Sequence, residues 1–548
     1  MSGNGSVSNI GIPVAFGRRA VLRAGAVTAA AAALPVPPAA AASPVFGHGV
    51  ASGDPLPDGV VLWTRVTVGP RALPGSGTGA PATVRWEVAE DALFTTVVAA
   101  GSRTADAESD HTVKVDVRGL APAHDYHYRF HALGATSPIG RTRTAPADTD
   151  SPDRLRFGVV SCANWEAGFF AAYRHLAARD DLDAVVHLGD YLYEYSSGTF
   201  EGRTGTVRQH EPVHEIISLA DYRIRHAQYK TDPDLMALHA RVPFICTWDD
   251  HESANNAWSG GAENHDPDTE GSWADRRAAS IRAYAEWMPV RLETTAGETR
   301  IYRRLRFGTL AELSMLDLRS YRDKQPELGT REGDDPARTM TGARQLEWLT
   351  AGLVSGSARW QVVGNSVMIA PLAFPPLDPE TTAAVTEVFG IPREGVVLNT
   401  DQWDGYPADR RRLLRALTDR GVGDVVFLTG DIHSSWAADV PLDAARYPGG
   451  PTAGAEFVVP SVTSTGIGDM LPTPPRTGSV ALEESVRALN RHIRYAELDS
   501  HGYGVVELVP ERVRMEWYYV GDVTDAHTGV RIAAAWELPH GGRLRPGR

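Results

Sequence analysis

The chain has 548 residues, 43% of them hydrophobic and 22% charged, which is long enough for two or three folded domains. Its formal charge of −14 at pH 7 becomes −17 without residues 1–42, whose only charged side chains are three arginines. An acidic surface of this kind attracts cations and argues against stable binding of nucleic acid along a broad basic face.

Residues 1–42 are predicted to be an export signal. Arg18 and Arg19 stand in a segment, residues 17–23, that resembles a twin-arginine motif, and an alanine-rich run with small residues near a cleavage region follows. We therefore expect a secreted protein that has the twin-arginine export machinery as a partner. No later stretch of about twenty apolar residues exists, so no membrane-spanning helix is expected.

Residues 43–150 have the character of strands. Val84, Trp86 and Val88 alternate with polar residues, and the same alternation recurs in the segments 113–117 and 126–130. This pattern predicts a small β-sandwich similar to fibronectin type III modules. A segment rich in Pro, Asp and Thr, residues 145–153, predicts the boundary of this domain near residue 150.

Beyond that boundary, residues 151–548 alternate between strand and helix patterns. A strand at Leu155–Val160, a helix within 166–179 and a strand at Ala184–Leu188 form a βαβ unit. Further helices are predicted at 273–288, 342–353 and 409–420, and further strands at 313–318, 360–363, 457–462, 503–508 and 513–519. The expected fold class is therefore α/β (α+β).

Four apolar, β-branched runs, at residues 154–160, 184–188, 242–247 and 425–429, each lead directly into residues that can bind metals. The groups at the four strand ends are Ser161-Cys162, Gly189-Asp190 with Tyr193, Asp249-Asp250-His251-Glu252, and Gly430-Asp431-Ile432-His433. Functional groups in open α/β sheets gather beyond the carboxyl ends of strands. The four ends are therefore expected to converge on one site.

Thiolate, phenolate, carboxylate and imidazole form an unusual set of ligands. Carboxylates suit Ca²⁺ or Mn²⁺, imidazole suits zinc and iron, and a thiolate beside a phenolate suits a ferric ion. Two different metals that share the carboxylate of Asp190 are the simplest arrangement. Two ions about 3.5 to 4 Å apart can activate a bridging water for in-line displacement at phosphorus.

The two cysteines, Cys162 and Cys246, could form a disulfide in a secreted protein. If Cys162 and Asp250 both lie at strand ends, Cys246 lies four residues lower, about 13 Å away at roughly 3.3 Å per residue. A disulfide needs Cα atoms within about 7 Å. We therefore predict two free thiols, with Cys162 protected as a metal ligand and Cys246 filling the core.

The blocks Gly189-Asp190, Asp250 to Glu252 and Gly430 to His433 resemble the ordered blocks of calcineurin-like metallophosphoesterases, and Cys162, Tyr193 and Asp249 narrow the resemblance to PhoD-type alkaline phosphatases. It extends to the opening segments 49–55 and 62–65, which look like that family's β-domain. The resemblance implies an N-terminal β-sandwich at 43–150, followed at 151–548 by a metallophosphoesterase-type catalytic domain with two sheets flanked by helices.

The same resemblance implies the cofactors and the roles of the site residues. Fe³⁺ would be held by Cys162, Asp190, Tyr193 and His433. One or two Ca²⁺ ions would be held by Asp190, Asp250 and Asp431, with Mn²⁺ or Zn²⁺ as substitutes. Asp190 and His251 would be the catalytic residues, with a hydroxide between the metals as nucleophile and His251 beside the leaving group.

Two departures from the wider superfamily leave assignments open. Ser161-Cys162 replaces the usual Asp-x-His block, and Asp250 replaces the usual Asn. Because neighbours on a strand point to opposite faces, only one of Asp249 and Asp250 is expected to reach the site, and Asp250 is favoured. The superfamily's histidine before the last block has no clear counterpart, and Asn365 is a tentative substitute.

Four further side chains have two interpretations each. Arg319 and Arg322, with Asp317 beside them, could orient phosphate or form a structural Arg-Asp pair, and His501 could line the site or belong to a turn. The structural pair is favoured for the arginines.

The sequence thus predicts a secreted, metal-dependent phosphoesterase that hydrolyses phosphomonoesters, phosphodiesters or both. A phospholipase D-like phosphodiesterase of the same fold, acting on a phospholipid, is the first alternative. The second is a secreted protein that holds calcium without catalysis. A monomer is favoured.

Overall fold

The computed structural model describes residues 44–295, 298–374 and 396–547, so the expected export signal lies outside the described residues. Among them, no helix combines the length and the apolar character that crossing a membrane requires.

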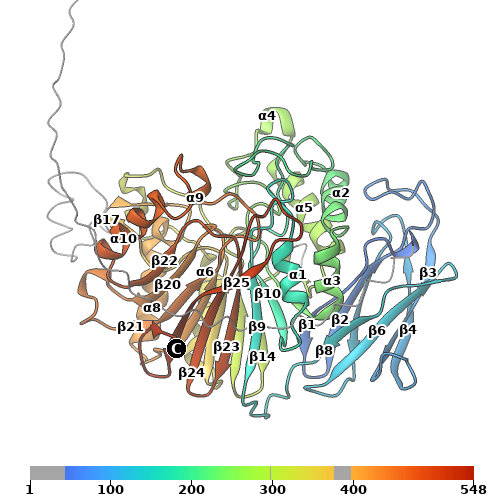
Figure 1. Cartoon of the computed structure of the whole chain (residues 1–548), viewed down its shortest axis with the longest axis horizontal. Coiled ribbons are helices and arrows are strands. Elements are labelled where there is room, and N and C mark those ends of the chain that lie inside the picture. The colour runs from blue at the N-terminus through green and yellow to red at the C-terminus, as the bar shows by residue number, and fades with distance from the viewer. Residues whose placement is uncertain (1–43, 296–297, 375–395, 548) are drawn as a thin grey trace, which may run out of the picture. The chain divides into compact units, whose positions relative to one another are not determined.

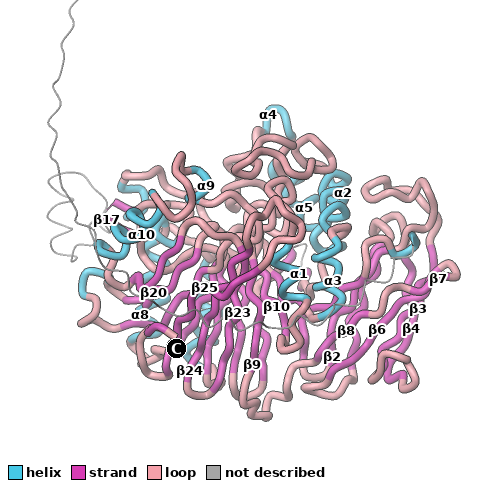
Figure 2. The backbone as a smooth tube through the Cα atoms, viewed as in Figure 1, coloured by secondary structure: helices cyan, strands magenta, loops and turns pink. Residues whose placement is uncertain are grey.

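Two large sheets form the centre of the fold (Figures 1 and 2). One has ten strands, in the order β26 (Arg545–Pro546), β25 (Val530–Pro539), β24 (Arg512–Val520), β23 (Gly502–Val509), β9 (Leu155–Val160), β10 (Ala184–His187), β11 (Phe244–Cys246), β1 (Val50–Leu56), β2 (Gly59–Arg65) and β5 (Thr112–Arg118). The other has seven, in the order β14 (Arg303–Phe307), β15 (Ala311–Met315), β16 (Trp360–Asn365), β19 (Val425–Thr429), β21 (Thr452–Val458), β20 (Ser435–Pro441) and β22 (Ile493–Glu497). Neighbouring strands β9, β10 and β11 are parallel, as are β15, β16, β19 and β21.

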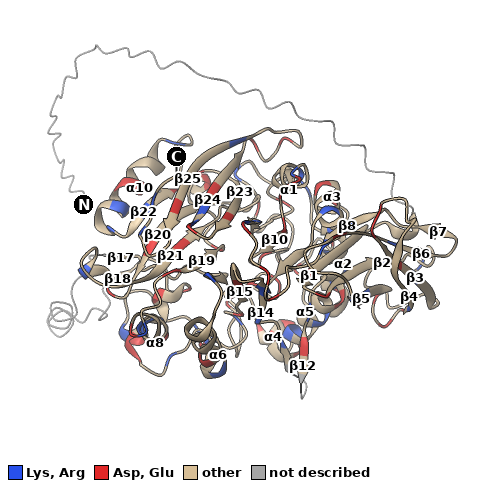
Figure 3. Ribbon diagram, turned by 90° about the horizontal axis from the view of Figure 1, so that it is seen from below, with Lys and Arg blue, Asp and Glu red and all other residues tan. Residues whose placement is uncertain are grey.

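The main apolar core lies between these sheets, because each contributes fully buried side chains to one cluster that includes Phe157, Val186, Val362 and Phe457. Helices cover the outer faces. The ten-stranded sheet packs against α1 (Ala171–Ala177), α2 (Leu219–Tyr229), α3 (Pro233–Arg241) and α5 (Trp273–Trp287), and the seven-stranded sheet against α6 (Gly342–Ser355) and α8 (Pro407–Thr418). Figure 3 shows α6 and α8 on the side of β19 and β21 that faces away from β23 and β24. The predicted α/β class, with two sheets flanked by helices, is confirmed.

The N-terminal strands are shared between two sheets. A five-stranded sheet contains β4 (Val97–Ala105), β3 (Ala82–Ala89), β6 (Asp125–Ala132), β7 (Ala135–Thr136) and β8 (Gly140–Arg143). Alternate residues of β3 and β6, including Val84 and Tyr128, pack with Val60 and Val115 of β2 and β5 in one core. Two layers of strands therefore enclose a core in this region, and the domain boundary near residue 150 stays a prediction.

One of those layers continues into residues 151–548, which the sequence pattern did not indicate. Strand β1 pairs with β11 in parallel, with Gly53 opposite Phe244. A Cβ at Gly53 would come within 2.7 Å of the Phe244 carbonyl oxygen and closer still to Pro289, so this junction requires glycine. The ten-stranded sheet therefore spans both predicted domains.

Candidate metal centre

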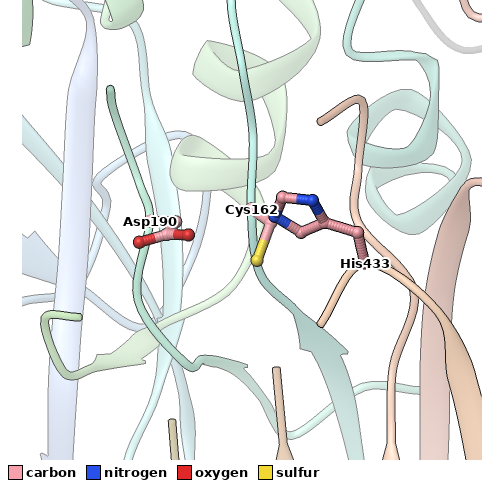
Figure 4. A group of neighbouring side chains, drawn as sticks. All are labelled: Cys162, Asp190 and His433. Atoms are coloured by element: carbon pink, nitrogen blue, oxygen red, sulfur yellow. The ribbon is translucent and has the colours of Figure 1, made fainter. Parts of the chain in front are cut away.

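The four predicted strand ends meet at one place. Strands β9, β10 and β11 bring three of them from the ten-stranded sheet, and β19 brings the fourth from the opposite sheet. Ligand atoms of Cys162, Asp190 and His433 lie within 4.8 Å of one another (Figure 4). The predicted convergence is confirmed, while binding of a metal there stays a prediction.

Sharp backbone turns direct these side chains into the site. Four residues of the site have backbone φ values in the left-handed region, which residues other than glycine rarely adopt. They are Cys162 (59°), Asp190 (53°), Asp431 (64°) and His433 (48°). Such conformations cost roughly 1–3 kcal/mol each and persist where the surrounding structure enforces them, commonly at functional sites. The four ligand candidates thus occupy strained turns at the ends of buried strands.

His433 is prepared to act as a neutral ligand. Its Nδ1 lies 2.8 Å from the carbonyl oxygen of Thr465 and donates a hydrogen bond to it, which leaves the lone pair of Nε2 free. Burial lowers the pKa of His433 to about 4. The Tyr193 hydroxyl lies 3.2 Å from Nε2 and donates to Asp190 Oδ2 at 3.0 Å, so Tyr193 belongs to the same cluster.

The thiol and the phenol need a cation to ionise. Burial, together with the charge of Asp190, raises the pKa values of Cys162 and Tyr193 well above their usual range. A metal ion deprotonates such ligands when it binds, because they bind it as anions. A thiolate, a phenolate, an imidazole and a carboxylate would then form a set that fits a ferric ion.

Carboxylates form a second, adjoining group. Oxygen atoms of Asp249, Asp250 and Asp431 lie within 4.8 Å of one another, and Asp250 also groups with Asp190 and His251. Three buried oxygens accept no hydrogen bond: Asp190 Oδ1, Asp249 Oδ2 and Asp250 Oδ1. Buried acceptors of this kind are rare in native proteins unless an ion or water satisfies them. The residues present therefore fit one or two hard cations such as Ca²⁺.

Asp249 and Asp250 both reach this cluster, so the expectation that only one would do so is wrong. That expectation assumed alternation along a strand. Strand β11 ends at Cys246, and the chain is no longer in a strand at Asp249 and Asp250.

Arg319 lies among the carboxylates. Its guanidinium contacts Asp249, lies 2.9 Å from Asp431 and 3.4 Å from Asp250, and pairs with Asp401 at 2.8 Å. Arg319 thus forms Arg-Asp pairs as favoured, but with carboxylates of the site and not with Asp317, which accepts hydrogen bonds from the backbone of Arg319 and Ser320. Asp401 was missed because it stands in a loop with no strand or helix pattern before it. The same loop supplies Gln402, whose amide donates to Asp431.

His251 is held by a carboxylate that the sequence analysis also missed. Its Nδ1 lies 2.7 Å from Glu194, which further accepts hydrogen bonds from the backbone of Asn255 at 2.7 Å and the side chain of Asn264 at 2.9 Å. Burial alone would lower the pKa of His251, but the charges of Glu194, Asp250 and Asp190 raise it well above the usual value. Glu194 directly follows Tyr193, and a carboxylate between aromatic residues in a buried segment was the available signal.

Glu252 ties two of the strand-end turns together. Its carboxylate accepts hydrogen bonds from the backbone N–H groups of Asp190 at 3.0 Å, Tyr191 at 2.6 Å and Asp249 at 2.8 Å. The turns after β10 and β11 are therefore fixed relative to each other by one buried side chain.

Two tentative residues make other contacts. The Asn365 amide donates to the carbonyl of Val367 at 2.5 Å, and its oxygen accepts from Trp403 at 2.9 Å, so nothing in these contacts supports Asn365 as a ligand. His501 contacts Ser461 at 2.9 Å and Asp469 at 3.1 Å. Cys162 and Cys246 are both free thiols, as predicted.

Comparisons with known proteins identify the chain's relatives. A model of the PhoD-like phosphatase family matches residues 157–517, and a model of the PhoD-like phosphatase N-terminal domain matches residues 29–146. Alkaline phosphatase D of Bacillus subtilis (strain 168) is 36% identical over 502 residues, covering 90% of this chain and 80% of that protein.

Solved structures give the same result for the fold. A structure of PhoD superposes with a TM-score of 0.82 at 35% identity and covers 92% of each chain. Purple acid phosphatase PPD1 from yellow lupin (Lupinus luteus) seeds superposes with a TM-score of 0.52 at 12% identity, covering 90% of this chain and 73% of that one, which shows a shared fold alone.

Proposed function

The chain belongs to the PhoD-like phosphatase family and is a hydrolase of phosphoric esters, and we propose that it is an exported enzyme that hydrolyses phosphomonoesters, phosphodiesters or both with the help of Fe³⁺ and Ca²⁺. The observation that carries this proposal is the meeting of Cys162, Asp190 and His433 within 4.8 Å, beside Tyr193.

Two groups of residues would hold the metals. Cys162, Asp190, Tyr193 and His433 would bind Fe³⁺, and Asp190 would share its carboxylate with a Ca²⁺ site that includes Asp250 and Asp431. Such cations would supply the Lewis acidity that makes a water nucleophilic at neutral pH, and they would neutralise negative charge that develops at phosphorus. We assign no metal to Asn365, because both ends of its amide are already hydrogen-bonded.

His251 would act on the leaving group. Its Nδ1 is engaged by Glu194, which fixes the ring and leaves Nε2 for the substrate. The negative charge of Glu194 stabilises the protonated ring, so Nε2 can donate a proton to the departing oxygen. Arg319 would hold the carboxylates of Asp401 and Asp431 in place beside the site.

Export by the twin-arginine route remains part of the proposal. It rests on Arg18 and Arg19 with the apolar run that follows them. That route carries folded proteins, so the metals could be inserted before export.

Metal analysis combined with a substrate panel tests the proposed function. We expect iron and calcium in the purified protein, and turnover of p-nitrophenyl phosphate, bis-p-nitrophenyl phosphate or both. Preference for phosphatidylcholine would instead favour a phospholipase D-like activity, and metal without any phosphate release would favour a protein that only holds calcium.

His251→Ala should lower kcat by roughly 10²- to 10⁴-fold, the usual contribution of a general acid, while metal content stays unchanged. His214→Ala is the matched control, because this histidine also pairs with a carboxylate, Asp221, but its side chain is 64% exposed. Equal activity in the two variants would remove His251 from the mechanism.

A further inference from the structure

A cavity of about 490 Å³ adjoins the carboxylate side of the metal centre. Two residues that line it also contact the centre: Asp401 pairs with Arg319 at 2.8 Å, and the backbone N–H of Asn256 donates to Asp250 at 2.6 Å. A cavity of this volume suits an organic group rather than a phosphate ion. It is therefore placed to receive the organic part of an ester whose phosphate lies at the metals.

Trp258 gives the cavity an aromatic wall in a fixed position. The half-buried indole lies on Gly261, where a Cβ would come within 2.6 Å of the ring. Trp258 and Gly261 exchange two backbone hydrogen bonds of 2.8 and 3.4 Å, which makes the turn compact.

Arg322 connects this turn to the metal centre. Its guanidinium donates to the carbonyl of Ala257 at 2.8 Å and to the Asp401 carboxylate at 2.6 Å, and its own carbonyl accepts from Ser259 at 3.0 Å. The residues on both sides of Trp258 are thus bound to one buried residue, Ala257 to the side chain of Arg322 and Ser259 to its backbone. The indole is held before any ligand arrives, which reduces the ordering cost of binding.

Lys324 and Gln325 line the cavity together with other polar residues, among them Glu263, Glu327 and Asn399. Lys324 is exposed, its Nζ lies 5.3 Å from the centre of the Trp258 ring, and it forms no ion pair with any residue in the described part of the chain. Gln325 also lines the cavity, and its Oε1 is buried without a hydrogen-bond partner. An exposed cation and an unsatisfied acceptor therefore accompany the aromatic wall.

We propose that this cavity binds the leaving group of phosphate esters whose organic part is a planar aromatic group, either a nucleobase or a simple aryl ring. The ring stacks on Trp258, the Lys324 ammonium moves over its opposite face, and the Gln325 amide turns toward the cavity so that Oε1 accepts a hydrogen bond from a ring amino group. This inference rests on the proposed function, since it assumes that the phosphate lies at the metal centre.

Kinetics of the metal-loaded full chain test the role of Trp258. Trp258→Ala should raise KM for p-nitrophenyl phosphate and adenosine 5′-monophosphate roughly tenfold, as expected for loss of one stacked ring. The KM for glycerol 3-phosphate, which has no ring, should stay unchanged. Trp258→Phe should retain most of the affinity because it keeps a ring. The matched control is Trp86→Ala, since Trp86 in β3 is equally half-buried and lies over Gly101, where a Cβ would come within 2.7 Å of its ring.

A binding measurement separates this inference from the proposed function. Calorimetric titration of adenosine and p-nitrophenol into the same proteins should show weaker binding by Trp258→Ala whether or not esters are hydrolysed. Wild-type protein that releases no phosphate but binds adenosine through Trp258 would contradict the proposed function and support the cavity.

Equal binding by wild type and Trp258→Ala, or an equal loss of turnover on glycerol 3-phosphate, would overturn the proposal. Gln325→Leu distinguishes the two ligand sources. If the preferred group is a nucleobase, this substitution should weaken the binding of adenosine 5′-monophosphate alone. If the preferred group is an aryl ring, it should leave the binding of both aromatic substrates unchanged.

Discussion

Cys162 and Cys246 offer a direct test of the metal centre at the scale of single residues. Both are buried and neither forms a disulfide, but only Cys162 lies beside Asp190 and His433. Cys162→Ser should lower iron content and remove the visible absorption expected of a thiolate bound to Fe³⁺, because a serine hydroxyl is a poor ligand for that ion at neutral pH.

Cys246→Ser is the matched control for that substitution. It places a hydroxyl in the apolar interior of β11 and should reduce stability by about 1–3 kcal/mol, yet leave the iron content and the colour intact. Metal analysis and visible spectroscopy provide the readout. Iron retained in full by Cys162→Ser would show that Cys162 is not a ligand.

The sequence could not reveal site residues whose role depends only on which side chains they contact in the folded protein. Cys162, Asp190 and His433 stand directly after apolar strands, and this position predicted their meeting. Glu194 and Asp401 are ordinary carboxylates along the chain, and only the folded structure places one against His251 and the other against Arg319.

At the scale of elements, Glu252 joins the turns that follow β10 and β11. Glu252→Gln keeps the shape but replaces one acceptor oxygen with an NH₂ group that faces backbone N–H donors. We expect a loss on the order of 3 kcal/mol in unfolding free energy, and reduced metal content because the turn that holds Asp190 loosens. Urea unfolding and metal analysis measure the two effects.

Asp409→Asn controls for stability alone. This buried carboxylate of α8 likewise accepts backbone hydrogen bonds, from Met340 at 2.9 Å and Thr341 at 3.3 Å, and neither residue belongs to the metal centre. It should therefore lose comparable stability and retain its metals. Parallel metal loss in both variants would mean that Glu252 has no specific role at the site.

The sequence predicted strand positions better than strand partners. Leu155–Val160 and Val425–Thr429 were predicted with the bounds that the structure shows, because long apolar, β-branched runs indicate strands buried on both faces. Apolar alternation in the N-terminal segment indicated which face is buried, but it carries no information about the neighbouring strand. The pairing of β1 with β11 was therefore not predicted.

At the scale of the whole molecule, lysine burial predicts how stability depends on pH. The chain has only three lysines, at 114, 230 and 324. Lys230 Nζ lies 4.9 and 4.8 Å from the ring centres of Trp63 and Tyr191 and contacts His239 at 3.0 Å. Burial lowers the pKa of Lys230 from 10.5 to about 7, and that of Lys114 to about 8.

The direction of this pH dependence follows from whether the folded or the unfolded chain binds the proton of Lys230. Between pH 7 and about 10.5 the unfolded chain binds a proton that folded Lys230 has released, so this lysine makes stability rise with pH in that window. Below pH 7 its full cost is present, and above about 10.5 the cost disappears. Buried Lys230 therefore destabilises the folded state least under alkaline conditions.

Lys230→Met should therefore stabilise the protein by roughly 4 kcal/mol near pH 6, with the gain falling toward zero by pH 10.5. His239 keeps a hydrogen-bonding partner in this variant, since Tyr191 lies 2.8 Å away. Urea unfolding at pH 6, 8 and 10 measures the difference from wild type. Exposed Lys324→Met should show no such trend, and a constant difference for Lys230→Met would contradict the assignment.

The shared ten-stranded sheet has a consequence for biosynthesis. Strand β11 is bordered on one side by β1, made about 190 residues earlier, while β9 on the far side of β10 waits for β23 near the end of the chain. The growing chain therefore has strand edges with unpaired backbone N–H and C=O groups until translation is nearly complete. We therefore expect this sheet to be completed only after β23 has been synthesised, rather than separately in the two predicted domains.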